Sequence, residues 1–146
     1  MKPLKVVKYL VVHCAANRCD RPFSVESLIN TGKQKWGQVS YHWYVRRNGD
    51  IIPLLSESVQ GIHVKGYNWC SLGIVYEGGL NEKGEAEDTR TEAQKHALIA
   101  LLRALKADYP DAQILGHRDL PRVKKDCPCF DARAEYLNLK PLKLEQ

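Results

Sequence analysis

The stretch Val6-Val7-Lys8-Tyr9-Leu10-Val11-Val12-His13 decides the fold of this chain. β-Branched and aromatic residues dominate residues 5–13, which predicts a buried strand that ends at His13. A second run of this kind, Ser71-Leu72-Gly73-Ile74-Val75-Tyr76, predicts another buried strand, which Gly78-Gly79 stops.

The remaining elements alternate between helix and strand. Thr91-Glu92-Ala93-Gln94 fits a capping box, and Asn48-Gly49 fits a two-residue hairpin turn. The other predicted elements are a helix at 24–34, strands at 39–47, 51–54 and 113–115, a helix that begins at Thr91 and ends before Pro110, and a helix at 131–137. The polar residues 80–90 are expected to be mobile. The order β-α-β-β-β-α-β-α predicts an α/β fold in which helices flank a central mixed sheet.

Length and composition indicate one globular domain over residues 1–146, with its core at about 6–137. The chain has 146 residues, of which 44% are hydrophobic and 27% charged. No apolar stretch approaches the roughly 20 residues that cross a membrane, so we expect no transmembrane segment. The N-terminal sequence lacks a signal-peptide pattern, so we expect synthesis in the cytoplasm. We also expect a monomer.

The cysteine count and the net charge indicate the redox state of the thiols and the class of binding partner. Five cysteines, an odd number, favour reduced thiols over a disulfide framework. The net charge of +5 favours anionic partners, among them nucleic acid, acidic lipid and anionic wall polymers. The basic residues are scattered and form no aromatic-basic stripe, so we expect no nucleic-acid partner.

Three side chains carry the chemistry that the sequence indicates. His13 ends the first strand, His117 follows the strand at 113–115 after a glycine, and Cys127 lies in a loop with Pro121 and Pro128. A single histidine at a strand end is more commonly a hydrogen-bonded polar residue. Together, two histidines and a cysteine match a catalytic zinc site with an open fourth position, where a bound water is activated.

Other familiar patterns fit less well. His117-Arg118-Asp119-Leu120 is similar to a kinase catalytic loop, but the chain has no glycine-rich phosphate loop and is too short for that fold. Cys127-Pro128-Cys129 has one intervening residue, which is not zinc-finger spacing. No His-Glu-x-x-His helix is present.

The motifs, taken in order, resemble the zinc-dependent N-acetylmuramoyl-L-alanine amidases, the group that includes bacteriophage T7-type lysozyme and the peptidoglycan recognition proteins. The resemblance covers about residues 6–137 and rests on Val12-His13-Cys14, Tyr41-His42-Trp43, Gly61 to Asn68, Ser71 to Ile74, Gly116-His117-Arg118 and Cys127 to Asp131. It implies a mixed sheet with flanking helices and a zinc-bearing groove on one face.

The resemblance also implies a role for each site residue. His13, His117 and Cys127 match the zinc ligands, with Cys129 as a rival thiol. Tyr41 and Lys125 match catalytic residues beside the metal, although the spacing between His117 and Cys127 is longer than in T7-type enzymes and leaves Lys124 as an alternative. His63 and Asn68 match groove residues that contact the muropeptide. His42 and Cys14 are expected to face away from Tyr41 and His13, respectively.

The implied activity is zinc-dependent hydrolysis of the amide between the lactyl group of N-acetylmuramic acid and L-alanine, in peptidoglycan or its fragments. The alternative is a non-catalytic peptidoglycan-binding receptor on the same fold. Two settings fit the sequence equally well, a phage lysis enzyme that reaches the wall after release and an enzyme that recycles wall fragments in the cytoplasm.

Overall fold

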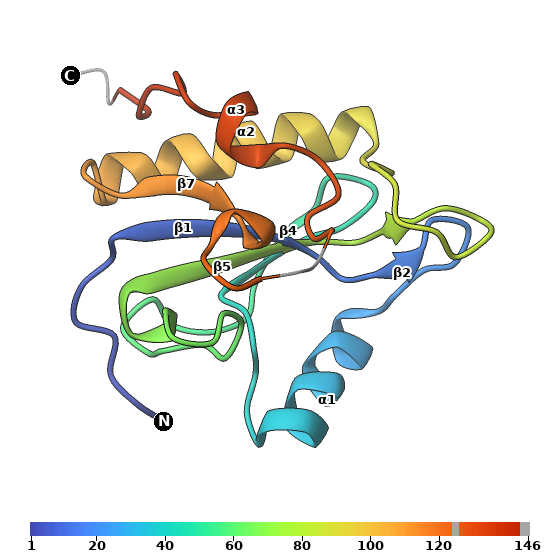
Figure 1. The fold of residues 1–146 in the computed structure, drawn as a ribbon, viewed down its shortest axis with the longest axis horizontal. Coiled ribbons are helices and arrows are strands. Elements are labelled where there is room, and N and C mark those ends of the chain that lie inside the picture. Colours follow the sequence, from blue (N-terminus) through green and yellow to red (C-terminus); the bar gives the residue numbers. More distant parts are fainter. Residues whose placement is uncertain (124–125, 144–146) are drawn as a thin grey trace.

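A computed structural model describes residues 1–123 and 126–143. Its central sheet has five strands in the order β4-β3-β5-β1-β7, and its strands pair in parallel except β3 and β4. The strands are β1 (Tyr9–Cys14), β3 (Trp43–Val45), β4 (Ile51–Pro53), β5 (Ser71–Tyr76) and β7 (Gln113–Gly116). The predicted α/β fold with a mixed sheet is confirmed (Figure 1).

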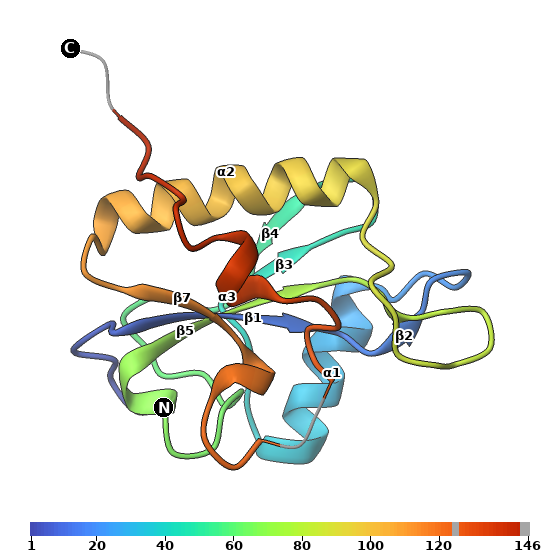
Figure 2. The same cartoon turned by 45° about the horizontal axis from the view of Figure 1, so that its top comes forward.

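Helices cover both faces of this sheet (Figures 1 and 2). The helices are α1 (Val25–Trp36), α2 (Glu92–Asp108) and α3 (Ala132–Glu135), with 3-10 turns at Asn68–Cys70 and His117–Asp119. Ser24 caps α1, and the predicted capping box of Thr91 and Gln94 begins α2. None of the helices in the described ranges is long and apolar enough to cross a membrane.

The alternation of side chains along β1 separates two cores. Leu10, Val12 and Cys14 point to the face covered by α2, where they join the largest hydrophobic cluster. Val11 points to the opposite face and packs against Val64, Leu115 and Leu120. His13 therefore emerges on this second face, at the carboxyl end of the strand.

Several expectations from the sequence differ from the structure. The strand predicted at 5–13 spans Tyr9–Cys14, and the turn between β3 and β4 takes residues 46–50 and not Asn48-Gly49 alone. The strand predicted at 39–47 is limited to Trp43–Val45, because the preceding segment bonds to a loop: the Ile62 N–H donates to the Ser40 carbonyl over 3.0 Å. Two short strands, β2 (Asn17–Arg18) and β6 (Gly79–Leu80), form a second sheet in segments where the sequence predicts no strand. The segment 80–90 also ends on a buried side chain, that of Arg90.

Candidate metal centre

The pairing of β1 with β7 brings the two predicted histidine ligands together. Val12 lies opposite Gly116 in this parallel pair, so His13, the next residue of β1, and His117, the first residue after β7, lie at the same level. Their ring centroids are 4.6 Å apart. Ligands of open α/β sheets bind beyond the carboxyl ends of the strands, which is where these rings lie.

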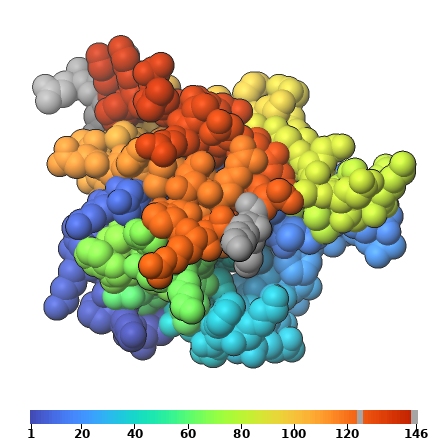
Figure 3. Space-filling model, viewed as in Figure 1, coloured from blue at the N-terminus to red at the C-terminus, as the bar shows by residue number. Residues whose placement is uncertain are grey.

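Cys127 completes the cluster from the loop that precedes α3, which lies on the face of the molecule shown in Figure 3. Its Sγ lies 3.8 Å from His13 Nδ1 and accepts a hydrogen bond from the Cys14 N–H over 3.2 Å. The loop is anchored on both sides, because the Arg118 N–H donates to the Cys127 carbonyl over 2.9 Å and the Tyr76 hydroxyl donates to the Pro128 carbonyl over 2.5 Å. Cys127 is therefore held at the end of β1.

The donor atoms of these three residues fit a single metal ion. One ligand atom from each of His13, His117 and Cys127 lies within 4.8 Å of the other two. Tetrahedral zinc places nitrogen and sulfur ligands at about 2.0–2.3 Å, which separates neighbouring ligand atoms by roughly 3.3–3.6 Å. Small side-chain movements would bring the three donors to these distances.

The second thiol of the loop has different surroundings. Cys129 Sγ lies 3.8 Å from Cys14 Sγ and donates to the Gly79 carbonyl over 3.3 Å. Cys14 is on the α2 side of the sheet, opposite His13 as expected. The hydrogen bond between the two thiols, together with burial, raises the pKa of Cys129. The structure thus groups Cys127, and not Cys129, with the two histidines.

Tyr41 lies beside the cluster, before the start of β3. Its ring centroid is 5.1 Å from that of His13, and burial raises the pKa of its hydroxyl. The phenol is therefore protonated at neutral pH and can donate a hydrogen bond. Lys125, and its alternative Lys124, lie outside the described residues.

His63 lies behind His13, as seen from Cys127, and is 9% exposed. Its Nδ1 is 2.9 Å from His13 Nε2, and its Nε2 is 3.2 Å from Ser71 Oγ. Burial, with the nearby His42, lowers the pKa of His63 to about 3, so this ring is neutral. Asn68 accepts hydrogen bonds from the backbone N–H groups of His63 and Val64 through Oδ1, both over 2.9 Å.

His42 differs from its expected position. It is fully buried and hydrogen-bonded, as the sequence indicates, with Nε2 bonded to the Val59 carbonyl and Nδ1 accepting from the Gly73 N–H. The ring does not lie across the sheet from Tyr41, however, because its centroid is 6.0 Å from that of His63. The strict alternation of a strand does not apply here, since β3 begins only at Trp43.

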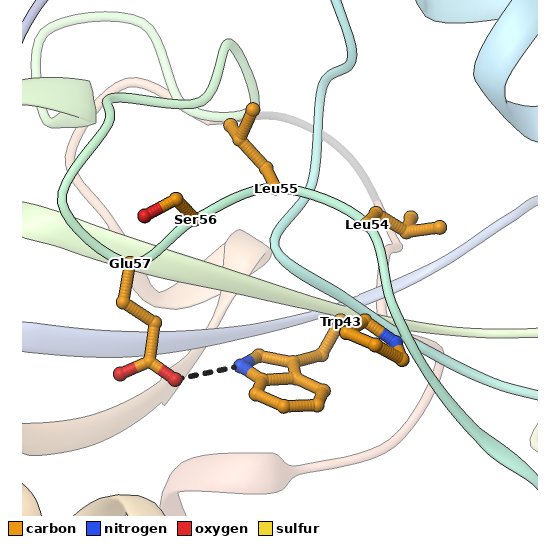
Figure 4. Close-up of a pocket in the computed structure, with 6 residues that line it drawn as sticks. Trp43, Leu54, Leu55, Ser56 and Glu57 are labelled. Carbon is orange, nitrogen blue, oxygen red and sulfur yellow. Dashed lines mark hydrogen bonds between the residues drawn. The ribbon is translucent and has the colours of Figure 1, made fainter.

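The cavity in Figure 4 is a separate feature. Trp43, Pro53, Leu54, Leu55, Ser56 and Glu57 line it. Trp43 packs against the cluster on the α2 side and donates to Glu57 Oε2 over 3.2 Å. None of the predicted site residues in the described ranges lines this cavity, so it does not belong to the metal centre.

The sequence patterns indicated neither the residues that support the site nor the buried charge after β5. Ser71 is fully buried and reaches His63, and Arg90 holds the loop of Cys127 through contacts with Phe130 and Glu135. Glu77 is 2% exposed and accepts from the Phe23 N–H and from Arg46 at the end of β5. Of these residues, the sequence offers a signal only for Glu77, because this charged residue directly follows the apolar run of β5.

The fold and the cluster define an α/β protein with three candidate metal ligands at one end of its sheet, an arrangement typical of catalytic metal centres. Residues 3–130 match the family model described as N-acetylmuramoyl-L-alanine amidase. The chain therefore belongs to this family. It is an enzyme that hydrolyses an amide bond of peptidoglycan.

Individual relatives agree with this assignment. An endolysin of Klebsiella phage KP32 is 36% identical over 125 residues, which are 85% of this chain and 82% of that protein. The structure of the N-acetylmuramoyl-L-alanine amidase LysC from Clostridium intestinale URNW aligns with a TM-score of 0.76 and 28% identity, over 92% of this chain and 87% of that one. Bumblebee PGRP-SA has a TM-score of 0.75 at 16% identity, over 94% and 85% of the two chains, a likeness in fold alone.

Proposed function

We propose that this amidase is zinc-dependent and that His13, His117 and Cys127 hold the ion. The observation that carries the proposal is the convergence of two imidazoles and one thiol within 4.8 Å at the ends of β1 and β7. Nitrogen and sulfur donors are the usual ligands of zinc, and three protein ligands leave one position for water or substrate. The scissile bond is the amide between the lactyl group of N-acetylmuramic acid and L-alanine.

Each residue contributes a separate part of the reaction. Bound zinc supplies a Lewis acid for the amide carbonyl and lowers the pKa of a coordinated water to about 7. The Cys14 N–H, bonded to Cys127 Sγ, stabilises negative charge on that sulfur. Tyr41 keeps its proton because of burial and donates a hydrogen bond to the oxygen on which negative charge develops. Lys125 is the second donor that we propose for this oxygen.

We propose intact cell wall as the substrate and release from the cytoplasm as the route to it. The support comes from relatives that are named endolysins. One of them is the endolysin of Klebsiella phage KP32, and the match to this chain covers 82% of that protein. A recycling enzyme would instead act on soluble muropeptides. The chain is expected to act as a monomer, which light scattering of the purified protein tests.

The test is digestion of purified sacculi by the protein, with its zinc content measured on the same sample. We expect one zinc per chain, release of new L-alanine amino termini and no new reducing sugar ends. Full activity of a metal-free preparation would refute the zinc dependence. New reducing ends without new amines would refute the amide as the bond cleaved. Cleavage of soluble muropeptides without cleavage of sacculi would refute the lytic role.

A further inference from the structure

A line of buried hydrogen bonds leads away from His13 on the side opposite Cys127. His13 Nε2 lies 2.9 Å from His63 Nδ1, and His63 Nε2 lies 3.2 Å from Ser71 Oγ. The Ser71 hydroxyl reaches the Tyr67 carbonyl over 2.7 Å. Ser71 is fully buried and His63 nearly so, which leaves these polar atoms to bond to one another. The line connects the first ligand of the metal centre to the backbone of a 3-10 turn.

The Tyr67 carbonyl at the end of this line determines which atom donates in each hydrogen bond. A carbonyl oxygen can only accept, so the Ser71 hydroxyl donates its proton to Tyr67. The Ser71 oxygen therefore accepts from His63 Nε2–H. A neutral imidazole that is protonated at Nε2 accepts at Nδ1, so His13 must donate to His63 through its own Nε2–H.

This direction fixes which nitrogen of His13 can bind a metal. Since the proton of His13 is on Nε2, its lone pair is on Nδ1. Nδ1 is also the atom that lies 3.8 Å from Cys127 Sγ, on the side of the metal ligands. The hydrogen bonds and the ligand geometry thus require the same tautomer.

Packing holds the His63 ring in the orientation that this line needs. A Cβ atom at Gly73 would lie 2.8 Å from Cγ of the ring, so only glycine lets the imidazole lie this close to β5. The Asn68 carboxamide fixes the backbone at the other end of the residue by accepting from its N–H. The ring is therefore positioned before any ligand binds.

We propose that His63 and Ser71 are positioning residues that, with the Tyr67 carbonyl, set the tautomer and ring orientation of His13 for metal binding. The inference rests on the proposed metal site and gives His63 a role other than contact with the muropeptide. Partners of this kind fix the ring of a metal-ligating histidine, and their loss typically lowers metal affinity by about 10–100-fold.

The first test is the zinc affinity of variants, measured by competition with a chromophoric chelator. Ser71→Ala removes the hydroxyl that accepts from His63 and leaves the Ser71 backbone as a partner of this ring, and His63→Leu removes the acceptor of His13. Both are expected to bind zinc about 10–100-fold more weakly. His63→Asn places an amide oxygen where Nδ1 was and should recover part of the loss. Cys70→Ala is the matched control, because the Cys70 thiol donates to the same Tyr67 carbonyl over 3.6 Å and is not a member of the line of hydrogen bonds described above.

Affinities within twofold of wild type in both Ser71→Ala and His63→Leu would overturn the proposal. An equal loss in Cys70→Ala would also overturn it, since that loss would come from general disturbance of the turn. A contact between His63 and substrate predicts a different pattern, namely a higher KM with unchanged zinc affinity.

The second test needs neither metal nor substrate. Imidazole ¹⁵N shifts of the metal-free wild-type chain should show both His13 and His63 as Nε2–H tautomers. Ser71→Ala should give a mixture at both rings. A wild-type His63 protonated at Nδ1 would overturn the proposal, whatever the variants do. Because this reading is independent of turnover, a chain with the expected tautomers but no amidase activity would refute the proposed function and leave the positioning role intact.

Discussion

Replacement of Arg90 by methionine should loosen the loop that carries Cys127. The guanidinium makes paired bonds to Asp88, at 2.9 Å each, and to Glu135, at 2.7 and 2.9 Å. Its Cζ also lies 3.3 Å from the ring centroid of Phe130, three residues after Cys127. The side chain of Arg90 is 2% exposed, so these contacts replace its hydration. The arginine thus joins the end of the segment 80–90 to the loop and to α3.

The magnitude follows from the burial of the three charges. Breaking a fully buried pair costs about 3–5 kcal/mol. The carboxylates of Asp88 and Glu135 have side chains that are 34% and 42% exposed, so water can rehydrate them and the cost is smaller. Methionine retains apolar contact with Phe130. We therefore expect Arg90→Met to lower the free energy of unfolding by about 2 kcal/mol, which is roughly 4–8 °C in Tm for a chain of this length.

Urea unfolding of the metal-free chain, followed by circular dichroism, measures this loss. The zinc affinity of the same variant measures the effect on the loop, and we expect a decrease of up to about tenfold, since 1.4 kcal/mol of ordering cost corresponds to a factor of ten. Arg133→Met removes an equal charge from an exposed position of α3 and serves as the control. If the free energy of unfolding of Arg90→Met lies within about 0.5 kcal/mol of the wild-type value and its zinc affinity is unchanged, Arg90 does not anchor the loop.

Three further predictions concern individual side chains. Cys127→Ser should lose zinc, whereas Cys129→Ser should retain most of it, as elemental analysis will show; the reverse result would identify Cys129 as the ligand. Tyr41→Phe should keep its fold and its zinc but lose about 10²–10³ in turnover, so near-normal turnover would exclude Tyr41 as the donor to the oxyanion. The pKa of Glu77 is lowered, because hydrogen bonds, first that from Arg46, outweigh the opposing effect of burial. Glu77 therefore stabilises the fold above the pKa of its unfolded state, near 4.5, and this contribution is lost as pH falls through the lower folded value. In Glu77→Gln, the free energy of unfolding should therefore fall less steeply as the pH is lowered below about 4.5 than in the wild type. An equally steep fall in the variant would contradict this reasoning.

Continuous apolar runs made most of the fold predictable. β1 and β5 are buried on both faces, so their composition alone identifies them. The capping box at Thr91 locates the start of α2 to the residue. The strand at 39–47 was predicted too long, because the N–H of Ile62, a residue distant in sequence, bonds the carbonyl of Ser40. Local composition carries no information on such a partner.

The grouping of His13, His117 and Cys127 was predictable from the sequence, and the contacts that support this group were less so. His13 and His117 each end an apolar strand, and that position is visible in the sequence. The bond between His13 and His63 joins residues 50 positions apart, and no local pattern indicates it. The burial of Arg90 could not be predicted, because the polar sequence around it is the same as that around an exposed arginine. Its partners Phe130 and Glu135 are distant in sequence.

The hydrogen bond between the Arg118 N–H and the Cys127 carbonyl has a consequence for how this enzyme can vary. The chain departs from the candidate metal centre just after His117 and returns to it at Cys127, and this 2.9 Å bond closes the two ends together. Lengthening a closed surface loop costs little, about 0.6 kcal/mol for each doubling of its length. An insertion should therefore be tolerated where it leaves in place Leu120, which packs in the second core, and the proposed donor Lys125. Such an insertion could carry a new wall-recognition segment beside the site without displacing His117 or Cys127.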